Sequence, residues 1–181
     1  MSKILVIFSS KYGHTKLYAL WLSEALNADI CDAKELKKVA LQDYSTVIFG
    51  SSLYASGSKA AALIVKHFER IKNKNVILFT CGLADVESAS NIEAINNNLN
   101  KVLTPEIRNS IKIFHVRGGI DYNKLSFMHK LMMKFVYSQT SKKPQNELTD
   151  EDKDFISTYG QKIDFSDKKM LEPIIHYVNS K

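Results

Sequence analysis

The side chains best suited to chemistry lie near the start of the chain, in the run Ser9, Ser10, Lys11, Tyr12, Gly13, His14 and Thr15. The apolar residues 4–8 precede this run and a stretch of helical spacing follows it, which predicts a turn between a strand and a helix. The hydroxyls of Ser10 and Thr15, the small Gly13 and the backbone N–H groups of a helix N-terminus can together bind an oxyanion. We therefore expect this turn to hold a phosphate group.

Other phosphate-binding patterns are missing from the turn. It lacks the G-x-x-x-x-G-K-[ST] motif of nucleoside triphosphate sites and the G-x-G-x-x-G motif of dinucleotide sites. It also lacks the acidic residues that a phospho-acceptor receiver of similar topology needs after its first strand. The alternative that stays open is a serine-rich turn that serves only to cap the helix.

The two cysteines, Cys31 and Cys81, lie fifty residues apart and form no C-x-x-C pair. This spacing supports neither a disulfide framework nor a zinc site, and it favours a reducing compartment. We predict no metal. The thiol of Cys81 is interpreted as an inert small apolar group, with reactivity as the less common alternative.

Short apolar runs alternate with longer stretches of helical period, which predicts a parallel sheet with helices on both faces. The expected strands are residues 4–8, 28–31, 46–49, 76–80 and 111–116. Apolar stripes between these runs predict helices that include residues 15–26, 64–71 and 92–102. In folds of this kind ligands bind at the carboxyl ends of the strands, beside the first helix.

Two further helix starts are marked by capping-box spacing, Ser90 before Glu93 and Thr149 before Asp152. The second opens a closing amphipathic helix. A length of 181 residues fits one domain, which we place at residues 1–165, with residues 166–181 as a C-terminal tail. The alternative is that the apolar residues of this tail pack on the domain, through Ile174, Ile175, Tyr177 and Val178.

The charge of the chain is concentrated in one segment. The formal net charge is +6, and residues 112–143 hold seven basic residues and one acidic residue, which equals the whole excess. One local basic surface is therefore expected, and no nucleic-acid partner. The apolar run at residues 4–8 is too short for a signal peptide or a membrane span, so we expect a cytoplasmic protein.

Residues 125–137 combine lysines with an excess of apolar side chains, nine of thirteen. On a helical wheel most of the apolar residues share one broad face. This pattern is typical of a helix that lies on an anionic membrane surface or receives a lipophilic quinone or tetrapyrrole. The alternative is a helix packed on its own sheet. The surface would include Lys124, Phe127, Lys130, Met133 and Lys134.

The turn at residues 9–15 resembles the FMN phosphate-binding signature of flavodoxins, with Ser10, Gly13 and Thr15 at the characteristic positions. Residues 43–54 are similar to the third strand of that family and its following loop, and residues 79–83 to its second ring-contacting loop. The resemblance implies a flavodoxin-like, doubly wound α/β fold with a five-stranded parallel sheet in the order 2-1-3-4-5. It also implies one noncovalently bound FMN.

The resemblance assigns cofactor-binding residues beyond the turn. These are Ser51, Ser52, Leu53, Tyr54, Ala55, Cys81, Gly82 and Leu83. Tyr54 is the side chain best suited to stack on the flavin ring or to shield one of its faces. Because flavin redox is the chemistry of the cofactor, no catalytic side chain is assigned.

Within this superfamily the chain is most similar to the menaquinone-dependent protoporphyrinogen dehydrogenase group, which carries an insertion after the fifth strand. The counterpart here spans about residues 117–145, with a basic and apolar helix. The resemblance implies an FMN-dependent oxidoreductase that moves electrons between a hydrophobic tetrapyrrole-like substrate and a quinone or other acceptor, at the inner face of the membrane. The alternative is a flavodoxin-type electron carrier that serves a partner redox enzyme without substrate chemistry of its own.

Overall fold

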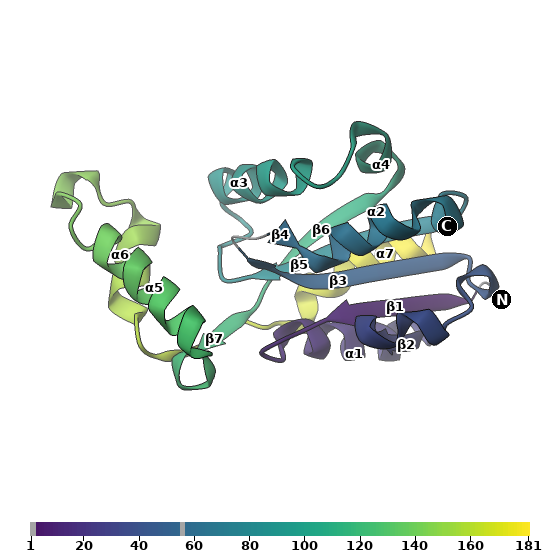
Figure 1. The fold of residues 1–181 in the computed structure, drawn as a ribbon, viewed down its shortest axis with the longest axis horizontal. Coiled ribbons are helices and arrows are strands. Elements are labelled where there is room, and N and C mark those ends of the chain that lie inside the picture. Colours follow the sequence, from purple (N-terminus) through teal and green to yellow (C-terminus); the bar gives the residue numbers. More distant parts are fainter. Residues whose placement is uncertain (1–2, 55–56) are drawn as a thin grey trace. The chain divides into compact units, whose positions relative to one another are not determined.

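Parallel strands form the main sheet of the computed structural model, which describes residues 3–54 and 57–181 (Figure 1). They are β1 (Ile4–Ser9), β2 (Asp29–Asp32), β3 (Thr46–Tyr54), β5 (Asn75–Gly82) and β6 (Lys112–Arg117). Their order across the sheet is β2-β1-β3-β5-β6, and the short β4 (Gly57–Ser58) pairs antiparallel with the end of β3. The five parallel strands therefore have the predicted order 2-1-3-4-5, and each predicted apolar run became a strand.

Helices cover both faces of this sheet. They are α1 (His14–Leu26), α2 (Lys59–Ile71), α3 (Ala89–Asn100), α4 (Pro105–Ser110) and α7 (Glu172–Asn179). Alternate residues of each strand point to opposite faces, so Ile7 belongs to a buried cluster that includes residues of α2, α3 and α4, whereas Val6 belongs to one that includes residues of α1 and α7. The crossovers between parallel strands thus produce a separate apolar core on each face.

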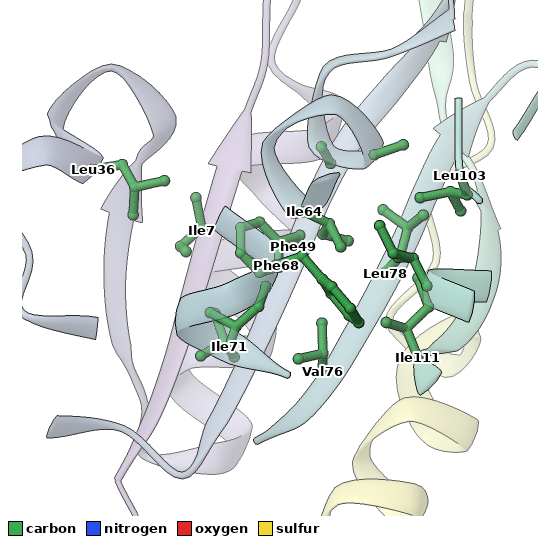
Figure 2. Close-up of a cluster of buried hydrophobic side chains, with 14 of the residues drawn as sticks. Ile7, Leu36, Phe49, Ile64, Phe68, Ile71, Val76, Leu78, Leu103 and Ile111 are labelled. Atoms are coloured by element: carbon green, nitrogen blue, oxygen red, sulfur yellow. The ribbon is translucent and has the colours of Figure 1, made fainter. Parts of the chain in front are cut away.

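The core under α2 shows how tightly the sheet is packed. Phe49 of β3 is fully buried beside Ile64 and Phe68 of α2 (Figure 2). On the other face, the ring of Phe79 lies against the backbone of Gly50, where an added Cβ would come within 2.1 Å of the ring. Only glycine leaves room for this ring, so packing requires a glycine at position 50, just before Ser51 and Ser52.

Residues 166–181 are not the tail that the sequence predicts. They form a short 3-10 helix followed by α7, and Leu171, Ile174 and Val178 are buried against the sheet. Burying an aliphatic side chain of this size stabilises the fold by about 1.5–3 kcal/mol. The segment packs on the α1 face of the core, and α7, rather than the helix after Thr149, is the last helix of the chain.

The chain divides into two units, one formed by residues 1–118 and 165–181 and the other by residues 119–164. The second unit contains β7 (Gly119–Asp121), α5 (Phe127–Thr140), α6 (Asp150–Thr158) and β8 (Lys162–Asp164). Strands β7 and β8 pair antiparallel and bring its two ends together. The insertion is therefore longer than the predicted residues 117–145, because it includes α6.

Only one of the two predicted capping boxes formed. At α6, the Thr149 hydroxyl accepts the N–H of Asp152 and the Asp152 carboxylate accepts the N–H of Thr149, each at 3.1 Å. At α3, the helix begins at Ala89, so Ser90 lies inside it and its hydroxyl bonds to that of Ser88. The prediction at Ser90 was wrong because the helix begins two residues earlier than a box at Ser90 requires, with Ser88 at the N-cap position.

Candidate flavin site

The predicted phosphate turn joins the carboxyl end of β1 to the start of α1. The N–H of Gly13 donates to the hydroxyl of Ser10 at 3.1 Å, which closes the turn. Gly13 has a φ of 105° and occupies the N-cap position, and the space where its Cβ would stand is open. No acidic residue lies in the first turn of α1. The positive end of the helix dipole therefore faces an opening that a glycine keeps clear.

The flanking residues of the turn contribute bulk and charge. Lys11 lies over the ring of Tyr12, with its ammonium 5.5 Å from the ring centroid. Such a pair holds a positive charge at the edge of the turn. His14 pairs through Nδ1 with the hydroxyl of Ser166 at 3.1 Å, which ties the start of α1 to the segment before α7.

Thr15 connects the two halves of the predicted site. Its side chain is fully buried, and its hydroxyl lies 2.9 Å from the hydroxyl of Ser52 near the end of β3. The sequence predicted both residues as cofactor ligands in separate loops. Their hydrogen bond joins the start of α1, next to the predicted phosphate turn, to the end of β3.

The predicted ring loop at residues 51–55 is mostly strand, because β3 continues to Tyr54. The Ser51 hydroxyl is buried, lies 2.8 Å from that of Ser58 and accepts the N–H of Ala60, so it serves the start of α2. Leu53 packs against the core and pairs with Ser58. Ala55 and the side chain of Tyr54 lie outside what the structure describes, and Tyr54 stays a prediction as the stacking residue.

The second predicted loop is also mostly strand, because β5 continues to Gly82 and only Leu83 follows it. Leu83 is held by an arginine that the sequence did not single out as a site residue. The Arg117 Nε–H donates to the carbonyl of Leu83 at 3.0 Å. Its guanidinium lies 3.7 Å from the centroid of the Phe165 ring and 4.0 Å from the Asp85 carboxylate. The signal available in the sequence was the position of Arg117 at the end of the last strand, where it is in register with Gly82.

The neighbouring glycine, Gly118, marks a close approach of three segments. An added Cβ would lie 2.7 Å from the Cys81 sulfur and 3.2 Å from the Cβ of His14, and its own N–H donates to the carbonyl of Gly82. The buried thiol of Cys81 therefore packs where β5, β6 and α1 meet. The predicted interpretation of Cys81 as a small packed group agrees with this position.

A row of polar side chains crosses the sheet at its carboxyl end. The strand register places Ser9 beside Ser51, Ser51 beside Thr80 and Thr80 beside His115. The Thr80 hydroxyl lies 2.7 Å from Nδ1 of His115. Burial, together with the positive charge of Arg108, lowers the pKa of His115 below its usual value, which favours the neutral imidazole. The apolar sheet thus ends in a polar edge.

The residues at this edge fit FMN. An anionic phosphate matches the open helix N-terminus at Gly13 and the hydroxyls around it, while Ser52 is in register with Cys81, so the two predicted ring segments lie side by side. A flat ring can then be bordered by backbone at Leu53 and Gly82, where an added Cβ on Gly82 would meet nothing within 4 Å. The structure therefore brings together the predicted residues of the turn and of both loops, as far as they are described.

The predicted surface on the insertion lies in the second unit, on or just before α5. Lys124, Phe127, Lys130 and Lys134 are exposed. Met133 is only partly exposed and shares the helix face of Tyr137, one turn later, which packs on α6. Met133 therefore does not share the exposed surface of the other four residues.

Several solved structures resemble the chain at low sequence identity. A flavoprotein from Lactobacillus acidophilus, solved in complex with FMN, has 14% identity and a TM-score of 0.41, over 65% of this chain and 93% of that one. Flavodoxin 2 from Bacillus cereus, in its oxidised form, has 21% identity and a TM-score of 0.37, over 64% and 86%. A flavodoxin from the domain Archaea has 18% identity and a TM-score of 0.37, over 64% and 85%.

No curated protein matches the chain. The flavodoxin domain family matches residues 5–147, which include the phosphate turn, both ring segments and α5. With the strand order and the phosphate turn described above, this match shows that the chain belongs to the flavodoxin domain family.

Proposed function

We propose that the chain is an FMN-dependent oxidoreductase that holds one FMN at the carboxyl edge of its main sheet. The observation that carries this proposal is the hydrogen bond between Thr15 and Ser52, which joins an open phosphate turn to the ring segments. Membership of the flavodoxin family supports FMN as the cofactor. Bound FMN supplies one-electron and two-electron redox chemistry, and the protein supplies orientation and access.

Each part of the site has a defined task in this proposal. Backbone N–H groups at the start of α1 and the Ser10 hydroxyl bind the phosphate. The segment from Ser52 to Tyr54 and the backbone of Gly82 border the ring. Arg117 fixes the position of the second segment through its bond to the carbonyl of Leu83, so it acts as a positioning residue.

For the substrate we infer a hydrophobic tetrapyrrole such as protoporphyrinogen, with a quinone as electron acceptor. Support comes from the place where the insertion begins. Gly118, the last residue of the flavodoxin core before it, lies close to Cys81 and His14 of the site. The insertion also carries a basic and apolar helix, α5, which suits an apolar substrate with carboxylates. Every two electrons and two protons removed from the substrate reduce one quinone to a quinol.

The test is anaerobic turnover by the full chain. The protein is loaded with FMN, mixed with protoporphyrinogen and a soluble menaquinone analogue, and porphyrin fluorescence is compared with flavin-only and protein-free controls. Protein-dependent porphyrin formation is the expected result. A bound and reducible flavin without porphyrin formation would reject the substrate and leave an electron carrier. Failure to retain FMN would reject the whole proposal.

A further inference from the structure

The helix α5 exposes most of its apolar side chains. Six large apolar residues on it are between 38% and 78% exposed: Phe127, Met128, Leu131, Met132, Phe135 and Val136. In the rest of the part that the structure describes, exposed apolar residues of this size occur only singly, at Leu20, Ile30 and Val65. The spacing of the six residues repeats every fourth position, so they form one continuous face along the helix, which we name the α5 apolar face.

The α5 apolar face is not needed to pack the second unit. The opposite side of α5 is already occupied, because Tyr137 stacks on Tyr159, which directly follows α6, with ring centroids 4.1 Å apart. Phe155 and Tyr122 extend this aromatic cluster, with Tyr122 5.1 Å from Tyr159. The unit therefore has its own core, and the exposed face is not covered within this unit.

The charges of the second unit are separated along the sequence. Residues 122–143 contain five lysines and no acidic residue, whereas residues 144–164 contain two lysines and six acidic residues. On α5 itself Lys130 and Lys134 are exposed beside the apolar face. A second copy of α5 would carry the same positive charge, which disfavours self-association. An anionic occupant matches these lysines.

We propose that the α5 apolar face docks on the surface of an anionic lipid bilayer, with the helix lying in the plane of the interface. The apolar side chains enter the boundary between head groups and acyl chains, while the lysine stems extend toward anionic head groups. A helix of 14 residues is about 21 Å long and falls short of an apolar layer of about 30 Å. Within the described residues, no helix has the length and apolar character needed to span a membrane.

This inference goes beyond the proposed function, because docking requires no bound flavin. It is tested by sedimentation of the full chain with vesicles of phosphatidylglycerol and phosphatidylcholine, against vesicles of phosphatidylcholine alone. We expect binding to the anionic vesicles that weakens with added salt. The variant Phe127→Gln with Phe135→Gln should bind at least about tenfold more weakly. The variant Lys130→Gln with Lys134→Gln should lose about tenfold.

The matched control is Leu20→Gln with Val65→Gln, which removes exposed apolar side chains from the other unit. It should bind vesicles as the unmodified protein does. Circular dichroism checks that each variant is folded. Absence of binding by the unmodified protein, equal loss in the control, or a dimer that forms without vesicles and is abolished by Phe127→Gln with Phe135→Gln would each overturn the proposal.

Discussion

The two units of the chain use apolar side chains in opposite ways. In the flavodoxin core, Phe49 and Phe79 are fully buried between the sheet and its helices, whereas in the insertion Phe127 and Phe135 are 78% and 64% exposed. The same residue type therefore stabilises one unit and forms the surface of the other. Apolar content therefore predicts burial only where a facing element is present to cover it.

The largest expected effect separates these two uses directly. Phe49→Ala should lower the free energy of unfolding by about 3–5 kcal/mol, because it leaves a cavity in a closely packed core. Phe127→Ala should change it by less than about 0.5 kcal/mol, since the side chain is exposed. Urea unfolding of both variants measures the difference. Similar losses for the two would mean that Phe127 is a core residue and that the comparison is wrong.

The second effect concerns the ligand. Replacing Ser10→Ala and Thr15→Val together should weaken FMN binding by about 30-fold, or about 2 kcal/mol, because the turn loses its phosphate-facing hydroxyl and its bond to Ser52. Riboflavin, which lacks the phosphate, should lose less than about threefold.

Ser157→Ala with Thr158→Val is the matched control for this pair, since these hydroxyls bond to the Asp154 carbonyl in α6 of the other unit. It should leave both affinities unchanged in a fluorescence titration. Equal losses of FMN and riboflavin affinity in the Ser10 and Thr15 variant would show that this turn does not bind the phosphate.

A smaller effect is expected at Tyr18, which joins α1 to the end of β6. Its hydroxyl donates to the Arg117 carbonyl at 2.6 Å and accepts the N–H of Asp167 at 3.1 Å. Tyr18→Phe should cost about 1–2 kcal/mol, because buried backbone groups lose their partner. Tyr44→Phe, which removes an exposed bond to Asp29, is the matched control and should cost less.

The same tyrosine predicts a pH dependence. Burial raises the pKa of Tyr18 to about 12, above its ordinary value of 10. The neutral form is therefore favoured in the folded state, and this stability is present below pH 10 and lost as the pH rises toward 12. Urea unfolding at pH 8 and pH 11 should show a smaller alkaline loss in Tyr18→Phe than in the unmodified chain. If Tyr18→Phe lost as much stability at pH 11 as the unmodified chain, the alkaline loss would come from other tyrosines.

The smallest effect belongs to the insertion. Thr149→Ala should destabilise α6 by about 1 kcal/mol, because the capping box loses the hydroxyl that accepts the N–H of Asp152. Hydrogen exchange should speed up in α6 and stay unchanged in the flavodoxin core. Ser88→Ala is a matched control, since the Ser88 side chain does not cap α3. Equal effects of the two variants would contradict the capping role.

Much of the fold could be predicted because its signals are local. Buried parallel strands require unbroken apolar runs, and the runs at residues 4–8 and 76–80 became the central strands β1 and β5. The turn between β1 and α1 was predicted for the same reason, since its hydroxyls and Gly13 lie within seven consecutive residues. Its binding of a phosphate stays a prediction. The box at Thr149 was also local, and it formed.

What the sequence could not predict depends on partners distant along the chain. The apolar residues of the segment 166–181 left packing as an alternative to a tail, and the choice depends on the strand and α1 residues with which Ile174 and Val178 share a buried cluster. Arg117 gains its place from the ring of Phe165 and the carbonyl of Leu83. The period of the apolar residues on α5 is the same whether that face is covered or exposed, so its exposure required the structure.

The most direct test of the account is a titration of the full chain with FMN, with riboflavin in parallel, followed by quenching of flavin fluorescence. We predict saturation at one FMN per chain and a clearly weaker affinity for riboflavin, because riboflavin has no phosphate to place at the open helix N-terminus around Gly13. Saturation by both flavins at the same affinity, or no quenching by FMN, would contradict it.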